Sequence, residues 1–229
     1  MPNLKSLQLD LTGWTLDQEQ EEESLWFDIE GDALVVNLFN IQPDIPAPCN
    51  GSEGLRNYFR QLAHTEGGGI VEVDVVRIHN IACASLIIKM PQTPRGWTYL
   101  GSVVIPRQNF SFVIRVQCVE HGMTGGREAV VMILEDSNLQ TEPIVEEYIE
   151  DPIFGRVLRA GEMRGWKKDP YDPQFDKIAL FNLADQQKYD AQLPQHPLSR
   201  VRRKLAHIIN TVHFGRDILD AAEWRDSSF

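Results

Sequence analysis

A glycine-rich loop in the middle of the chain has the composition of an anion site. Residues 122–129 read GMTGGREA and continue into a segment with many apolar residues. A helix that begins there would present free backbone N–H groups and a favourable dipole to a phosphate or carboxylate, and an arginine could add a two-point contact. The loop lacks the glycine spacing and the Lys-Ser/Thr ending of a nucleotide-binding P-loop. The candidate ligand-binding residues are Thr124, Gly125, Gly126 and Arg127.

The same loop also has a purely structural interpretation. Gly125 and Gly126 can form a tight turn, because glycine adopts backbone conformations that other residues avoid. Arg127 can then pair with Glu128 or with another nearby acid of the same chain. This interpretation needs no ligand, and it is the simpler of the two.

Glu120 and His121 immediately precede the loop and could act as the acid and base of a small-ligand site. Together with Glu72 or Asp74 they could instead form a metal or acid/base site. An acid/base role requires each group to lie within hydrogen-bond reach of its target. A single histidine in a turn is more often structural or solvated. Charged residues of the central strands could instead form cross-strand ion pairs, and these residues are Glu72, Asp74, Lys89 and Arg115.

Aromatic and basic residues border the strand that begins at residue 97 and suggest a protein-binding surface. Exposed Trp97 and Tyr99, with Arg107 at the far end, would be typical of interface residues, because aromatic and arginine side chains contribute strongly to protein binding. The alternative is that Trp97 packs in the core.

A basic run lies on a predicted helix near the C-terminus. Arg200, Arg202, Arg203 and Lys204 leave the apolar stripe of that helix free. Such a helix can bind nucleic acid, a membrane surface or an acidic partner. Because the chain has 33 acidic residues of its own, we expect the helix to dock on the body of the protein, with its charged face solvated or paired with acids of the same chain.

The familiar catalytic and metal-binding patterns are missing from the sequence. There is no Gly-x-Ser-x-Gly elbow and no His-Glu-x-x-His motif. The three cysteines, Cys49, Cys83 and Cys118, are widely spaced, which indicates neither a zinc site nor a disulfide framework. We therefore expect no metal and no cofactor.

Composition and charge narrow the classes of partner. The chain has 229 residues, with a hydrophobic fraction of 42% and a formal net charge of −11. A net charge of this sign disfavours non-specific binding to nucleic acid or to an anionic membrane. No apolar run approaches the roughly 20 residues that span a bilayer, and the N-terminus lacks the pattern of a signal peptide. These features predict a cytoplasmic protein with a protein partner and leave its oligomeric state open.

Residues 69–119 predict four consecutive β-strands joined by short turns. In the fourth of them, Phe110, Phe112 and Ile114 alternate with Ser111, Val113 and Arg115, which gives one apolar face and one mixed face. The links are too short for helical crossovers and therefore indicate antiparallel pairing. Residues 25–29 and 33–39 predict an earlier hairpin.

Apolar residues at spacings of three and four predict helices over residues 52–64 and 198–212. Residues 124–135 predict a third helix, apolar nearly all round and therefore buried against the sheet. Residues 176–189 predict a short helix, and the acidic run 17–24 predicts a solvated loop or edge. We expect a core domain over 1–140, with a Pro- and Gly-rich segment and the C-terminal helix, 141–229, packed on it.

The order of these elements from residue 25 to residue 135 resembles the PsbP-like fold, an antiparallel sheet flanked by helices. The likeness lies in the early hairpin, the helix at 52–64, the strands that include WTYLGSVVIP, and the helix at 124–135. That family includes photosystem extrinsic proteins and a nuclear-transport factor that binds a small GTPase. The resemblance implies a binding or assembly protein; residues 140–229 fall outside it, and no functional residue carries over.

Together these features predict an α+β protein: an antiparallel sheet meander flanked by helices in an α/β/α arrangement, with a helical C-terminal extension. The function we expect first is a non-catalytic interaction or assembly module. An enzyme or binding protein for a small anionic ligand, and an immunity-type protein that neutralises a toxin, are the alternatives.

Overall fold

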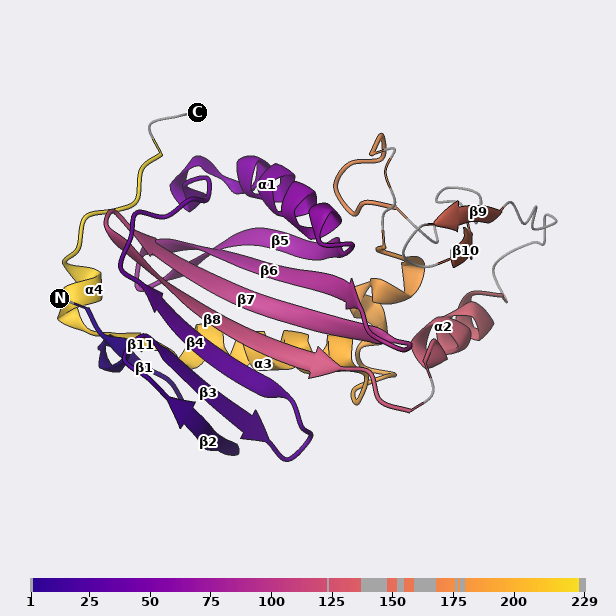
Figure 1. Cartoon of the computed structure of the whole chain (residues 1–229), viewed down its shortest axis with the longest axis horizontal. Helices are drawn as coiled ribbons and strands as arrows, with labels where there is room; N and C mark the ends of the chain where they lie inside the picture. Colours follow the sequence, from indigo (N-terminus) through magenta and orange to yellow (C-terminus); the bar gives the residue numbers. More distant parts are fainter. Residues whose placement is uncertain are drawn as a thin grey trace.

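A seven-stranded antiparallel sheet organises the protein (Figure 1). The structure is a computed structural model that describes residues 2–122, 124–136, 148–151, 155–158, 168–175, 177 and 180–226. In spatial order the strands are β2 (Trp14–Glu19), β3 (Glu23–Asp28), β4 (Ala33–Phe39), β8 (Phe110–Val119), β7 (Trp97–Arg107), β6 (Ile81–Pro91) and β5 (Gly69–Ile78).

The central strands were predicted correctly, because their side chains alternate between the two faces. β4 spans the predicted residues 33–39, and β8 begins with Phe110 as expected. The β5–β6 hairpin turns tightly through His79 and Asn80, both at positive φ, a conformation that suits the twist of a two-residue hairpin. The acidic run 17–24, predicted as a loop or edge, forms the end of β2, a turn and the start of β3, at one edge of the sheet.

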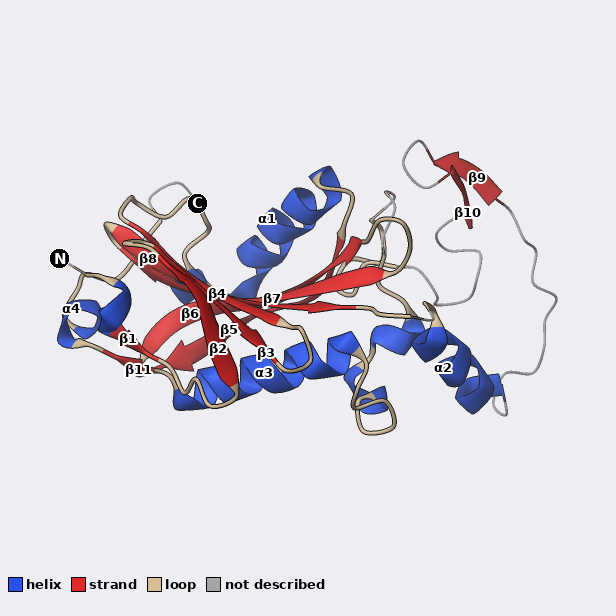
Figure 2. Ribbon diagram, turned by 60° about the horizontal axis from the view of Figure 1, so that its bottom comes forward, coloured by secondary structure: helices blue, strands red, loops and turns tan. Residues whose placement is uncertain are grey.

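Helices cover both faces of the sheet, as Figure 2 shows. Helix α1 (Ser52–Thr65) packs on β5 and β6, where Leu55 and Phe59 are buried in a core that includes Val73. Farther along that face, Arg115 on β8 is exposed. The mixed face is thus covered at one side and open at the other.

Helix α3 (Pro197–Thr211) lies across the opposite face and completes the main core. Its N-cap is His196, whose ring accepts a hydrogen bond from the Leu198 N–H. The helix approaches β7 closely at Gly101, where an added Cβ would lie 2.6 Å from side-chain atoms of Val201 and Leu205. The C-terminal helix thus packs on the sheet, and a glycine makes the close contact possible.

Helix α2 (Gly126–Asp136) departs from the prediction. It lies beyond the end of the strands instead of across the sheet (Figures 1 and 2), and it packs chiefly on the short turn at Leu183–Asp185. Val131 is buried, whereas Val130, Met132 and Ile133 are exposed. The expectation of a helix buried on the sheet was wrong, because α1 and α3 already cover the two faces.

The remaining elements are short. In the described part of 176–189 the chain forms two 3₁₀ turns, Leu183–Asp185 and Gln187–Tyr189, where a helix was predicted. Strand pairs and turns complete the chain: β1 (Leu7–Gln8) with β11 (His213–Phe214), β9 (Tyr148–Asp151) with β10 (Gly155–Leu158), the 3₁₀ turns Leu4–Ser6 and Pro48–Asn50, and α4 (Arg216–Leu219). Among the described residues, no helix is both long and apolar enough to span a bilayer.

Candidate functional site

The loop between β8 and α2 is held to the sheet by Glu120. The two oxygens of its buried carboxylate accept hydrogen bonds from the Trp97 N–H at 3.0 Å and the Gly125 N–H at 3.2 Å. Burial raises the pKa of Glu120, and the hydrogen bond from Gly125 opposes that rise. His121 and Thr124 are exposed. Glu120 therefore braces the loop, whereas His121 is exposed to solvent.

Arg127 is turned into the protein, with only 1% of its surface exposed. Its guanidinium donates to the backbone carbonyls of Ala184 at 2.6 Å and Gln186 at 3.1 Å. It also donates to Ser199 Oγ at 2.8 Å and to the Asp190 carboxylate at 2.7 Å. These partners occupy the positions that an anion would need, so the arginine joins α2 to the C-terminal extension. The predicted alternative of a structural arginine fits this geometry.

A buried ion pair between Lys89 of β6 and Asp185 lies beside that arginine. Both side chains are fully buried, and their charged atoms are 3.0 Å apart. Glu128 of α2 is 3.6 Å from the Lys89 ammonium, which also lies 4.6 Å from the centre of the Trp97 ring. Burial, followed by the charge of Asp185, raises the pKa of Tyr99 well above its usual value. The lysine thus has two carboxylates and an aromatic ring around it.

The partners of the charged strand residues come from helices and from the C-terminal extension, not from neighbouring strands. Glu72 pairs with Arg202 of α3, and Asp74 pairs with Arg56 of α1. Arg115 makes no ion pair within the described part of the chain. The expectation of cross-strand pairs was therefore wrong.

His196 is a largely buried histidine close to this cluster. Its Nδ1 accepts from the Leu198 N–H at 3.2 Å, so the ring proton of the neutral form is on Nε2, which faces a Glu120 oxygen at 3.9 Å. Burial, followed by the positive charges of Arg127 and Lys89, lowers the pKa of His196 to about 3. The ring is therefore neutral around pH 7 and serves as a helix cap.

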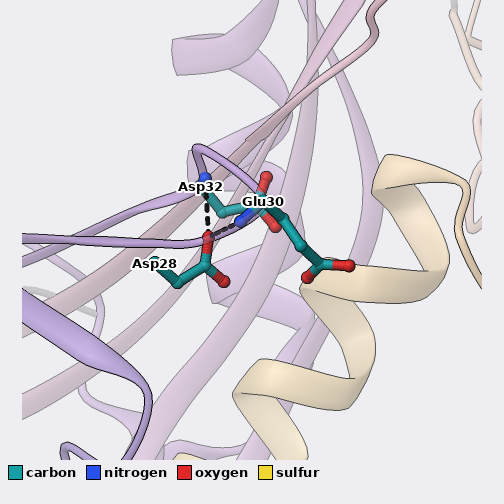
Figure 3. A group of neighbouring side chains, drawn as sticks. All are labelled: Asp28, Glu30 and Asp32. Carbon is teal, nitrogen blue, oxygen red and sulfur yellow. Dashed lines mark hydrogen bonds between the residues drawn. The ribbon is translucent and has the colours of Figure 1, made fainter.

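Three carboxylates at the β3–β4 turn form the second charged cluster (Figure 3). Asp28, Glu30 and Asp32 each place one oxygen within 4.8 Å of the others, a spacing that could hold a metal ion. The ammonium of Lys204 on α3 contacts all three, and Arg200 makes a two-point contact with Asp32. The lysine therefore supplies the positive charge that a cation would otherwise provide. The basic face of α3 was predicted to be solvated or paired with acids of the same chain, and Arg200 and Lys204 show the second arrangement.

The predicted partner surface around Trp97 is largely inside the protein. Tyr99 is fully buried beside the Lys89 pair, and Arg107 is 5% exposed. The Arg107 guanidinium donates to the Leu219 carbonyl at 3.4 Å. The backbone of Arg107 also forms an isolated β-bridge with Glu223. Trp97 is partly buried against the main core. Tyr99 and Arg107 do not form an exposed surface, because their strand lies at the centre of the sheet.

The outer side of α2 carries several exposed apolar side chains. Ile133 is 74% exposed and Val130 is 38% exposed, and they lie three residues apart on one side of the helix. Met132 on the same helix is also exposed, whereas Val131 packs inward on Ala184 and Tyr189. The sequence showed this helix as apolar all round; the structure divides those residues into an anchored side and an outward side.

Comparisons with known proteins show similarity of fold only. No model of a protein family matches the sequence, and no curated protein matches it. The solution structure of cyanobacterial PsbP from Synechocystis is similar over 58% of this chain and 84% of its own, with a TM-score of 0.37 and 11% identity. The predicted PsbP-like resemblance is thus found over a segment, and it is weak.

Two further solved structures give similarly weak matches. A protein of unknown function from Pseudomonas aeruginosa, described as a putative regulator, matches 57% of this chain and 98% of its own, with a TM-score of 0.32 and 15% identity. A crystal structure from Bacteroides thetaiotaomicron matches 50% of this chain with a TM-score of 0.31 and 10% identity, and the match spans 38% of that protein.

Proposed function

We propose that this protein is a non-catalytic interaction module that docks the outer side of α2 on a partner protein. The observation that carries the proposal is the exposed apolar side of a helix whose inner side is tied down by buried ionic contacts. Val130 and Ile133 have the i, i+3 spacing of anchors that insert into an apolar groove. Scattered single apolar residues on a surface need no explanation, but several on one short helix mark an interaction site.

The buried charges support a structural role for the adjoining cluster. Arg127 and Lys89 are surrounded by hydrogen-bond acceptors of the same chain. Binding a small anion at the start of α2 would require Arg127 to leave those contacts, each of which is costly to break when buried. The small-anion hypothesis is for that reason the weaker one.

The charge of the molecule supports a partner with a basic rim. The net charge of the molecule is −11. We infer a partner whose apolar groove is bordered by Lys and Arg, because complementary charge steers association.

Three free cysteines, with Cys49 exposed, support a cytoplasmic location, since thiols persist in a reducing compartment. A toxin-neutralising role is one form that such a module could take.

The test removes the apolar anchors without touching the buried side of α2. The double variant Val130→Ser, Ile133→Ser is compared with Leu62→Ser on α1, a matched control because Leu62 is 44% exposed on another helix. The tagged full chain is purified from its own host's lysate and the partner is identified by mass spectrometry. The affinity of the reconstituted pair is then measured by calorimetry.

We expect one dominant partner, bound about 30-fold more weakly by the double variant, on the basis of about 1 kcal/mol for each half-buried aliphatic side chain. The Leu62→Ser control should bind like the wild type. Equal affinity of the double variant and the wild type would overturn the proposal. Size-exclusion chromatography with light scattering tests whether the partner is a second copy of this chain.

A further inference from the structure

A cleft of about 560 Å³ lies at the opposite end of β8 from the ionic cluster. Its walls come from five places in the sequence: the N-terminal segment, the β2–β3 turn, the residue that follows β4, the β7–β8 turn and the residues that follow α4. The volume lies within the range of about 300–1,000 Å³ that is typical of small-molecule sites. One wall is fixed by the Gln108 N–H, which donates to the Ala222 carbonyl at 3.0 Å.

The floor of the cleft is apolar. Phe110, the first residue of β8, is 7% exposed and contributes to the lining together with Ala221. The Phe110 ring is held edge-on against Phe112, with the ring centres 5.9 Å apart. The floor is therefore a rigid aromatic and aliphatic surface, against which an apolar ligand body can pack.

The rim of the cleft carries one negative charge, on Glu21, and the side-chain amides of Gln108 and Asn109. Glu21 is the only charged residue in the lining, and within the described part of the chain its carboxylate has no ion pair or hydrogen bond. The side-chain amides of Gln108 and Asn109 also line the cleft, and neither makes a hydrogen bond to another described residue. Asn40, by contrast, donates to Glu22 at 2.6 Å and is already engaged.

We propose that this cleft binds a small organic cation, such as an alkylamine or a quaternary ammonium compound with a short polar arm. The methyl or methylene groups pack on Phe110, the positive charge faces Glu21, and the polar arm bonds the free amides of Gln108 and Asn109. An aromatic surface beside a carboxylate suits ammonium compounds, whose charge is spread over apolar groups. An anionic ligand would meet Glu21 in a molecule that is already strongly acidic.

The experiment distinguishes the contribution of the ligand's charge to binding from that of its shape. Choline is titrated into the ¹⁵N-labelled full chain and followed by NMR, and its neutral isostere 3,3-dimethyl-1-butanol is titrated in parallel. The variant Glu21→Gln removes the charge in the cleft. Glu19→Gln is the matched control, because Glu19 is an exposed acid of the same hairpin outside the lining.

We expect saturable shifts with choline at the amides of the two turns and of the side chains of Gln108 and Asn109. Glu21→Gln should weaken binding about fivefold, the most that an exposed ion pair contributes, and Glu19→Gln should leave it unchanged. The neutral isostere should bind as weakly to the wild type as choline binds to Glu21→Gln. The proposal fails if choline causes no saturable shift, if both variants weaken binding equally, or if the isostere binds as well as choline.

Discussion

Replacing Lys204 by methionine should destabilise the protein far more than an ordinary surface substitution. The ammonium contacts Asp28, Glu30 and Asp32, and the Asp32 side chain is completely buried. Methionine keeps most of the side-chain volume but leaves three crowded carboxylates with Arg200 as the one remaining cation in contact with them. Removing one partner of a buried ionic group costs about 3–5 kcal/mol, and because Arg200 still pairs with Asp32 we expect about 3 kcal/mol.

The pH dependence of this loss follows from the two pKa shifts. Burial acts to lower the pKa of Lys204, but its hydrogen bonds to Asp28, Asp32 and Glu30 outweigh burial and raise it. Its contribution is therefore complete below the unfolded value of 10.5 and is lost only as pH rises through the higher folded value. Burial acts to raise the pKa of Asp32, but hydrogen bonds from Arg200 and Lys204 lower it.

The contribution of Asp32 is accordingly present above its unfolded pKa of 3.8 and lost as pH falls through the lower folded value. Without the lysine, the carboxylates repel one another and bind protons more readily. The difference between wild type and Lys204→Met should thus be larger at pH 8 than at pH 5.

Calcium should relieve part of the defect in the variant. The three carboxylate oxygens lie within 4.8 Å of one another, and two oxygens on opposite sides of a calcium ion are about 5 Å apart. Millimolar Ca²⁺ should therefore raise the free energy of unfolding of Lys204→Met and leave that of the wild type unchanged.

Urea unfolding at pH 5 and pH 8, with and without Ca²⁺, measures all of these effects. Lys188→Met is the control, because Lys188 also pairs with a carboxylate but its side chain is 54% exposed and should contribute little. If the two variants lose equal stability at pH 8, the account of Lys204 as a built-in counter-ion is wrong.

Three other features give measurable expectations. Gly101→Ala places a methyl group against α3 and should cost about 1–3 kcal/mol in urea unfolding, whereas Gly126→Ala, which has open space, should be nearly neutral. The pKa of His196 is lowered to about 3, so below about pH 6.5 the unfolded chain binds a proton there and the folded protein does not. Stability should fall over that range, and His196→Asn, which retains a capping oxygen, should flatten the fall in pH-dependent unfolding. Exposed Cys49 should react with a maleimide in the native protein, and the buried thiols of β6 and β8 only after unfolding, as mass spectrometry of the labelled chain would show.

The sheet could be predicted from the sequence because strand alternation is a local signal. In β8 the outward and inward side chains alternate along the whole strand, and short turns allow only antiparallel neighbours. The C-terminal helix was equally clear, since its buried residues recur at helical spacing. Local pattern also indicated that the basic residues of this helix would avoid the apolar stripe.

The charged clusters could not be predicted, because their members are brought together only by the tertiary fold. Arg200 binds Asp32 across 168 positions of the chain, and Lys89 binds Asp185 across 96. Asp185 lies in a segment predicted to be helical, where nothing distinguishes it from a solvated acid. Buried ionic groups carry no local signature, since each residue looks like a surface residue until its partner is known.

The position of α2 shows how burial depends on competition between elements. An all-round apolar helix is expected in a core, but α1 and α3 occupy the two faces of this sheet. What fixes α2 is instead the packing of Val131 together with a set of buried ionic contacts made by Arg127 and Glu128. Buried ion pairs are rarely more stabilising than apolar packing of the same volume, but each allows few arrangements. A helix held in this way keeps a defined orientation with Val131 as its inward apolar anchor, and Val130 and Ile133 remain on the outer side, where the proposed partner would bind.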